Sequence, residues 1–119
     1  VMEQLSPQEE EVMLAIWQTE GGFIRDFISK LKDPPAYTTV ASTVKNLERK
    51  GFVKSKKMAN SYWYQPALSA EAYNRNHFSQ VAKDYFSNSY KEMVTFFARE
   101  QKITPEELKE IIAMIENKK

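Results

Sequence analysis

The chain has 119 residues, with 17 basic and 16 acidic side chains, one histidine and no cysteine. This length suits one domain, or a small domain with a second short part, and a hydrophobic content of 42% allows a real core. The lack of cysteine excludes a disulfide scaffold, a thiolate metal site and a cysteine nucleophile. No apolar run is long enough to span a bilayer and no signal-peptide pattern opens the chain, so we expect a soluble, cytoplasmic protein with no membrane partner.

Two helices are predicted at the start of the chain. The first has Ser6 as its N-cap, Pro7 as its first residue and Glu9 as the second half of a capping box, and it ends at Gly21-Gly22. The second covers residues 24–31, where four apolar side chains recur at helical spacing. Pro34 and Pro35, a few residues further on, are expected to end it.

A third helix and a hairpin follow. The helix begins near Thr38, whose hydroxyl is the expected cap, and runs to Lys50. Residues 52–57 and 61–65 read as two strands, with Asn60 as the expected left-handed residue of the turn. The face of the helix opposite its apolar stripe has hydrogen-bonding and cationic groups but no carboxylate: Thr38, Ser42, Lys45, Asn46 and Arg49.

The nearly balanced total charge hides a basic segment that covers this helix and hairpin. Residues 37–65 hold six basic side chains and one acidic side chain, whereas residues 1–36 hold three basic and seven acidic ones. Residues 69–119 balance at eight of each. A local excess of one sign indicates an anionic partner more directly than the overall net charge of +1 does.

Three helices followed by a two-stranded hairpin is the order of a winged helix-turn-helix, in which the third helix enters the DNA major groove and the hairpin touches the backbone. The basic segment falls on those two elements, so we expect double-stranded DNA as the partner. For Thr39 and Tyr62, packing within the protein is as strongly expected as contact with DNA. The expected DNA contacts are Thr38, Thr39, Ser42, Lys45, Asn46, Arg49, Lys50, Lys54, Lys56, Lys57 and Tyr62.

The C-terminal part is predicted to be purely helical, with caps at Ser69 and Thr104. Its apolar stripes are one-sided, and a segment this short would struggle to bury them alone. We therefore expect a homodimer, with a winged-helix DNA-binding domain over residues 1–67 and a helical dimerisation domain over residues 68–119. The fold class is mainly α with a β wing. The expected dimer contacts are Phe78, Val81, Tyr85, Phe86, Met93, Phe97, Leu108, Ile111, Ile112 and Ile115.

Three segments together resemble the penicillinase-repressor family of transcriptional regulators. Residues 6–13 followed by Trp17 look like its opening helix, and residues 37–53 resemble its recognition helix running into the wing. Residues 62–66, with the letters YWYQP, are similar to its second wing strand. The resemblance implies a dimeric repressor that acts on a pseudo-palindromic operator, in a resistance or metal-homeostasis operon.

The resemblance also bears on how such a repressor is released. In the penicillinase branch, a β-lactam sensor leads to cleavage of the repressor at an Asn-Phe bond, which implies a regulatory protease as a further partner. The matching pair here is Phe96-Phe97, so the asparagine is missing. The copper branch binds metal through a Cys-x-Cys motif, which a chain without cysteine does not have. We expect neither a metal nor another cofactor.

Two other functions stay open at this point. The basic segment could bind an acidic protein partner, which would make the chain a winged-helix interaction module. An enzyme is a more distant alternative, because the sequence has no Gly-rich phosphate loop and no metal-ligand pair. His77, the one histidine, is expected to be an ordinary surface or interface residue.

Overall fold

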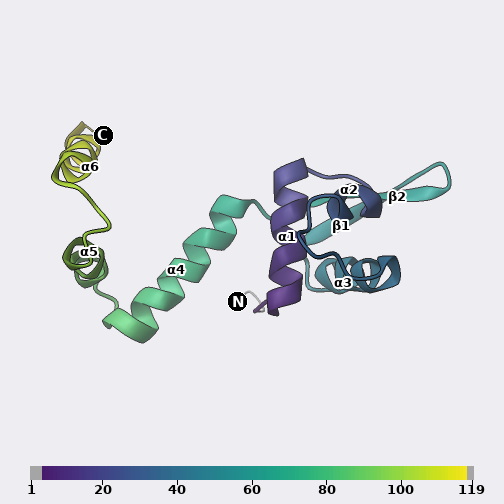
Figure 1. Cartoon of the computed structure of the whole chain (residues 1–119), viewed down its shortest axis with the longest axis horizontal. Coiled ribbons are helices and arrows are strands. Elements are labelled where there is room, and N and C mark those ends of the chain that lie inside the picture. The colour runs from purple at the N-terminus through teal and green to yellow at the C-terminus, as the bar shows by residue number, and fades with distance from the viewer. Residues whose placement is uncertain (1–3, 118–119) are drawn as a thin grey trace. The chain divides into compact units, whose positions relative to one another are not determined.

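The computed structural model describes residues 4–117, and the chain divides into two compact units, up to Asn76 and from His77 on (Figure 1). The helices and strands are α1 (Pro7–Thr19), α2 (Ile24–Ile28), α3 (Tyr37–Arg49), β1 (Val53–Met58), β2 (Ser61–Pro66), α4 (Ala70–Phe86), α5 (Tyr90–Arg99) and α6 (Pro105–Asn117). Three helices precede one antiparallel hairpin, and the rest of the chain is helical. This order confirms the mainly helical winged helix-turn-helix fold.

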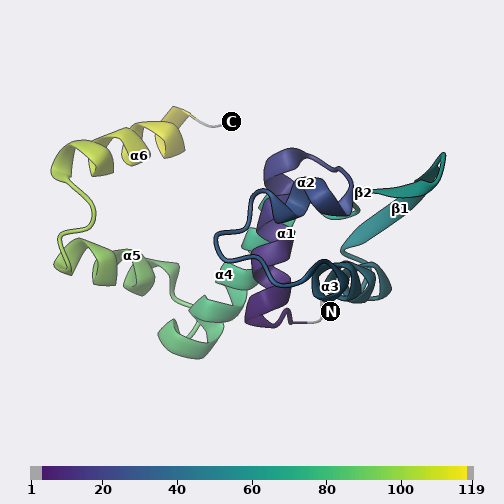
Figure 2. The same ribbon diagram turned by 45° about the vertical axis from the view of Figure 1, so that its right-hand side comes forward.

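The core of the first unit lies between α1, α2, α3 and the base of the hairpin (Figure 2). The apolar residues predicted for the inner faces of α1 and α3 are buried there, and Phe27 and Phe52 close the centre. Burying side chains of this size stabilises the fold by about 1.5–3 kcal/mol each. The largest fully buried side chains are Phe27, Phe52, Met13, Ile16, Leu47, Val12, Val40 and Val44.

The predicted caps of three helices are confirmed. The backbone N–H of Ser6 donates to Glu9 Oε1 at 2.8 Å and the backbone N–H of Glu9 donates to Ser6 Oγ at 3.1 Å, which is a complete capping box. Thr104 and Glu107 form the same reciprocal pair at the start of α6. Ser69 Oγ accepts a backbone N–H in the first turn of α4 at 3.0 Å.

The second helix is shorter than the prediction of residues 24–31. It ends at Ile28, and the following backbone continues as tight turns with hydrogen bonds from Lys30 to Phe27 and from Leu31 to Ile28. The Ser29 hydroxyl donates to the Asp26 carbonyl oxygen at 2.7 Å, which uses an acceptor at the end of the helix. Apolar spacing does not separate the two conformations, because these turns also return Leu31 to the core, at 9% exposure.

The predicted cap of the third helix was wrong. The helix starts one residue earlier than Thr38, and its N-cap is Ala36, which has no side chain that could accept a hydrogen bond. Ala36 has extended backbone angles, φ −58° and ψ 152°, directly after two prolines. The fixed φ of the two prolines restricts the chain that leads into Ala36, and the helix begins there without a polar cap.

The hairpin is regular, but the predicted turn residue was wrong. The strands pair from Val53 opposite Pro66 to Met58 opposite Ser61, which leaves a two-residue turn. Ala59, rather than Asn60, takes the positive φ, at 57°. The position after the first strand of a tight hairpin requires this conformation whatever residue stands there, so the register of the strands outweighed the local preference of asparagine.

The base of the hairpin is joined to the turn between α1 and α2. Gly22 and Tyr64 exchange two backbone hydrogen bonds, each 2.8 Å long, and form an isolated antiparallel bridge. Gly21 has a φ of 105°, and a Cβ there would lie 3.1 Å from the Tyr64 carbonyl oxygen. Glycine is therefore needed for this close approach of the two backbones.

The packing of the first unit continues into the first turns of α4. Trp17 Nε1 donates to the Leu68 carbonyl oxygen at 2.8 Å, and the Tyr73 hydroxyl donates to Glu10 at 2.9 Å. The rings of Trp17 and Tyr73 lie 5.3 Å apart. Burial, and then the hydrogen bond to Glu10, raise the pKa of Tyr73 to about 12. Contacts of the winged helix thus extend past residue 67, the predicted end of the DNA-binding domain, which stays a prediction.

Candidate nucleic-acid interface

The polar face predicted for the third helix is one exposed surface of α3. Thr38, Ser42, Lys45, Asn46 and Arg49 are all exposed, while Val40, Thr43, Val44 and Leu47 are buried on the opposite side. Thr43 is also held internally, because its hydroxyl donates to the Thr39 carbonyl oxygen at 2.9 Å. Thr39 itself is exposed, at the edge of this surface. The five exposed residues are called the polar face of α3 below.

Glu48, the one acidic residue of the basic segment, does not lie on the polar face of α3. It sits on the side of the helix near the hairpin, where its Oε2 accepts a hydrogen bond from Ser55 Oγ at 2.7 Å. The carboxylate therefore links α3 to β1, and the polar face of α3 carries only neutral and cationic groups. Such a face favours an anionic ligand over its whole width.

Lys50 differs from the other expected contacts. Its ammonium lies 2.8 Å from Glu9 Oε1 and 3.2 Å from the Gln4 carbonyl oxygen, and its side chain is only 13% exposed. Burial alone would raise the pKa of Glu9, but the hydrogen bond from Lys50 and the backbone N–H of Ser6 lower it below its usual value. Lys50 thus joins the end of α3 to the start of α1 and is not part of the exposed basic surface.

The three lysines of the hairpin do not share one face. Side chains alternate along a strand, and directly opposite residues of paired strands point to the same side. Lys57, opposite Tyr62, therefore shares the face of Ser55 and Tyr64, which is turned to α3. Lys54 and Lys56 lie on the other face, with Lys56 opposite Trp63. All three lysines and Tyr62 are exposed. The sequence pattern treated them as one basic group, and the structure separates them.

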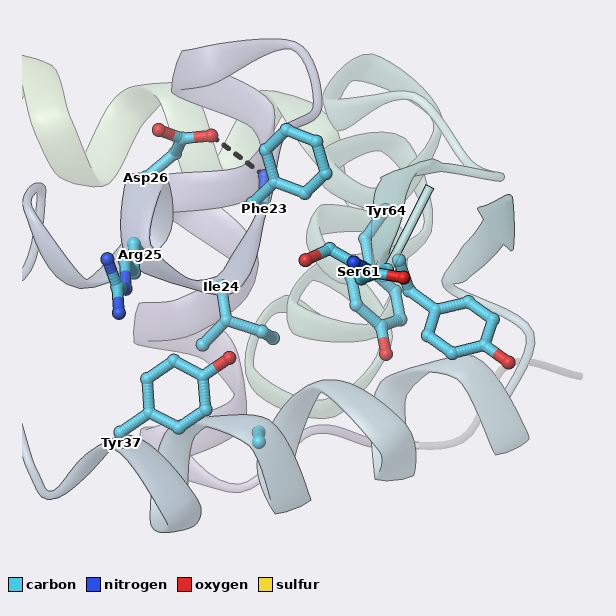
Figure 3. Close-up of a pocket in the computed structure, with 10 residues that line it drawn as sticks. Phe23, Ile24, Arg25, Asp26, Tyr37, Ser61 and Tyr64 are labelled. Atoms are coloured by element: carbon cyan, nitrogen blue, oxygen red, sulfur yellow. Dashed lines mark hydrogen bonds between the residues drawn. The ribbon is translucent and has the colours of Figure 1, made fainter. Parts of the chain in front are cut away.

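A cavity lies between α2, the start of α3 and the hairpin, beside the polar face of α3 (Figure 3). Its volume is about 630 Å³. The lining residues come from three segments that are far apart in the sequence, which is why no sequence pattern indicated it. They are Phe23, Ile24, Arg25, Asp26, Tyr37, Ala41, Asn60, Ser61, Tyr62 and Tyr64.

Neither a metal-binding cluster nor a membrane-spanning helix occurs among residues 4–117. Within that range no three His, Asp or Glu side chains come together as a group that could hold a metal ion. No helix of the same described part is long and apolar enough to cross a membrane.

The family profile described as "Penicillinase repressor" matches residues 5–117, nearly the whole chain. The chain belongs to the penicillinase repressor family. It is therefore a DNA-binding transcriptional repressor, in a family of regulators rather than of enzymes. The resemblance inferred from the opening helix, the recognition helix and the wing is confirmed.

Other comparisons add little to the family match. No curated protein matches the chain. Seven chains of solved structures do, among them a double mutant of ZitR from Lactococcus lactis in its apo form. That structure is 19% identical over 92% of this chain and 78% of its own, with a TM-score of 0.41. Similarity at this level bears on neither the ligand nor the target of the repressor.

Proposed function

We propose that this repressor acts as a homodimer that occupies a pseudo-palindromic operator and blocks transcription sterically. The observation that carries the DNA-binding part is the polar face of α3, which combines exposed cations with exposed hydroxyl and amide groups and has no carboxylate. Cations on this face release counterions from phosphates, and Ser42 and Asn46 present donors and acceptors for base edges. The proposed contacts are Thr38, Thr39, Ser42, Lys45, Asn46, Arg49, Lys54, Lys56, Lys57 and Tyr62.

The wing contacts are ordered by the face on which each residue lies. Lys57 and Tyr62 are on the hairpin face turned to α3, so a duplex held by α3 meets them first. Lys54 and Lys56 lie on the opposite face and would reach a backbone only if the hairpin enters a groove. Positive groups of this kind position the protein on DNA and carry no sequence information.

The support for a homodimer is the scarcity of buried side chains among residues 77–117 of the second unit. Neither α5 nor α6 has a buried residue, and Ala82 is the one buried residue of α4. Large apolar side chains are open to water there, including Phe78 at 51%, Ile112 at 52% and Ile115 at 68%. Apolar surface left exposed on three helices favours association, and a twofold interface buries the same residues of each copy.

A twofold dimer would place two copies of α3 about one DNA turn apart, roughly 34 Å, on two half-sites. Selection of bound sites from random DNA tests this directly, because the enriched sequence reports specificity and the half-site spacing reports the dimer. We expect an inverted repeat with half-sites about 10 base pairs apart, centre to centre. Retention of no DNA, together with binding to an acidic protein, would instead support an interaction module.

Only the family resemblance bears on the inducing signal. The pair at the position of the family's cleavage bond, Phe96-Phe97, lies exposed on α5, at 48% and 43%. The asparagine of the family's bond is absent from it. A regulatory protease and the type of operon regulated therefore stay predictions.

Replacing Lys50 with methionine is expected to lower the free energy of unfolding by about 2 kcal/mol while weakening operator binding less than threefold. The substitution leaves the buried Glu9 carboxylate without its main partner. Because the folded-state pKa of Glu9 is lowered, the pair stabilises the fold above pH 4.5 and the effect is lost as the pH falls below that value. Urea unfolding at pH 7 and pH 3.5 measures both parts.

The matched comparison for Lys50→Met is Arg49→Met, one residue earlier on the exposed face. Arg49→Met should show the reverse pattern, with unchanged stability and weaker operator binding. If Lys50→Met proved as stable as the parent protein and bound the operator as poorly as Arg49→Met, Lys50 would belong to the DNA interface after all.

A further inference from the structure

The cavity between α2, α3 and the hairpin is lined by a tyrosine hydroxyl that no other described residue uses. Tyr64 is only 6% exposed, yet no hydrogen bond within residues 4–117 involves its hydroxyl. No fully enclosed side-chain nitrogen or oxygen in that range lacks a partner, so the hydroxyl oxygen must reach the open space of the cavity. Because the oxygen faces the cavity, water or a bound acceptor can pair with it, and a ligand that replaces the water gains a directed hydrogen bond.

The walls of the cavity suit a flat ring that carries a negative charge. Phe23 and Tyr37 contribute aromatic surface, and Figure 3 shows the Tyr37 ring rising from α3 toward Ile24 of α2. Arg25 is the one cation of the lining. Its neighbour Asp26 also lines the cavity and offsets that charge in part; its carboxylate accepts the backbone N–H of Phe23 at 2.8 Å, and Figure 3 shows it directed to that atom.

The size of the cavity and the burial of the Tyr64 ring favour a small molecule over a DNA backbone as its occupant. The volume of about 630 Å³ lies within the range of small-molecule sites. Arg25 and Ser61 are exposed at the rim whereas the Tyr64 side chain is largely buried, so a phosphate of a duplex would meet the rim groups first. Burial, and then the charge of Glu48, raise the pKa of Tyr64, so this hydroxyl stays a donor at neutral pH.

We propose that this cavity is an effector site for a small aromatic carboxylate, whose ring packs between Phe23 and Tyr37. Arg25 binds the carboxylate, and the Tyr64 hydroxyl donates to an oxygen at the far side of the ring. Tyr37 and Ala41 belong to α3 and Ser61 belongs to the hairpin, so the occupied site fixes the two elements that the proposed function places on DNA. This regulatory consequence rests on the proposed function, whereas the binding of the ligand does not.

The probe for this site is 4-hydroxybenzoate, titrated into the full chain without DNA and followed by calorimetry and by amide NMR. We expect saturable binding with shifts at Tyr37, Ala41 and Tyr64. Tyr64→Phe should weaken binding about 3- to 10-fold and Arg25→Gln about 10-fold or more. The matched control is Lys30→Gln, which removes an exposed cation outside the cavity and should change binding less than twofold.

Two further ligands identify what the site recognises. The uncharged 4-hydroxybenzyl alcohol should bind at least about 10-fold more weakly, because it lacks the partner of Arg25. Inorganic phosphate should not shift the Tyr64 amide. If phosphate shifts these residues and 4-hydroxybenzoate does not, the cavity is a subsite for the DNA backbone and the proposal fails. It also fails if 4-hydroxybenzoate does not bind, or binds Tyr64→Phe and Arg25→Gln as tightly as the parent.

Tyr64→Phe also separates binding from folding. Since the hydroxyl has no partner within the described residues, its removal should leave the melting temperature unchanged or raise it. In a second arm, saturating 4-hydroxybenzoate should change the affinity for the selected operator by at least threefold, and should not do so in Arg25→Gln. If the probe binds but the affinity for the operator does not change, only the regulatory part of the proposal fails. If the probe binds but the protein binds no operator at all, only the proposed function fails.

Discussion

The double substitution Lys45→Ala and Arg49→Ala is expected to weaken binding to the selected operator at least about 100-fold at physiological salt. Both side chains are exposed on the polar face of α3, where they can reach phosphates and base edges. The change removes four cations from the proposed dimer, so the slope of log affinity against log salt should become shallower by up to about 3.6. Fluorescence anisotropy of a labelled operator at several salt concentrations measures both effects.

The control for this prediction removes the same amount of charge elsewhere. Lys102 and Lys109 are exposed cations of the second unit, and replacing both with alanine should leave affinity within about threefold of the parent. Equal losses in the two double variants would show that only the total charge matters. The polar face of α3 would then not be the DNA-reading surface.

The substitution Ile115→Asp is expected to convert the proposed dimer to monomer at micromolar concentration. Ile115 is 68% exposed in the single chain, so the new charge is tolerated by the fold of one copy. In the proposed interface the same carboxylate would be buried without a partner, which costs several kcal/mol for each of its two copies. Analytical ultracentrifugation should show a dissociation constant raised at least about 1,000-fold.

Ala113→Asp provides the matched control, because it adds the same charge to the opposite side of α6 two residues away. This variant should remain dimeric and bind the full operator normally. Ile115→Asp should instead bind a single half-site with the affinity of one parent subunit. It should lose the preference for DNA that carries two half-sites. A dimer in both variants would remove the apolar stripe of α6 from the proposed interface.

The elements of this fold were predictable where a local pattern dictates them. The capping box of Ser6 and Glu9 and the apolar stripe of α3 are read from a few neighbouring residues, and both are confirmed. The prediction was wrong where a longer-range constraint decides the conformation. Strand register placed Ala59 in the left-handed turn position, and a proline-directed chain made a polar cap for α3 unnecessary.

The same distinction applies to the candidate interface. The helical period predicted which residues of α3 share a face, since that face depends on spacing alone. It did not predict that Lys50 binds Glu9, because the two residues are 41 positions apart. No sequence pattern predicted the cavity either, because Arg25, Tyr37 and Tyr64 come together only when three separate elements pack.

The bridge between Gly22 and Tyr64 bears on how this repressor can diversify. Both of its hydrogen bonds use main-chain atoms, so exchanging the aromatic side chain at position 64 does not remove them. Mutation and selection can therefore alter the chemistry offered at that position while the anchoring of the wing stays the same. If the proposed effector site is correct, homologues with different aromatic residues there would be expected to keep one scaffold and bind different compounds.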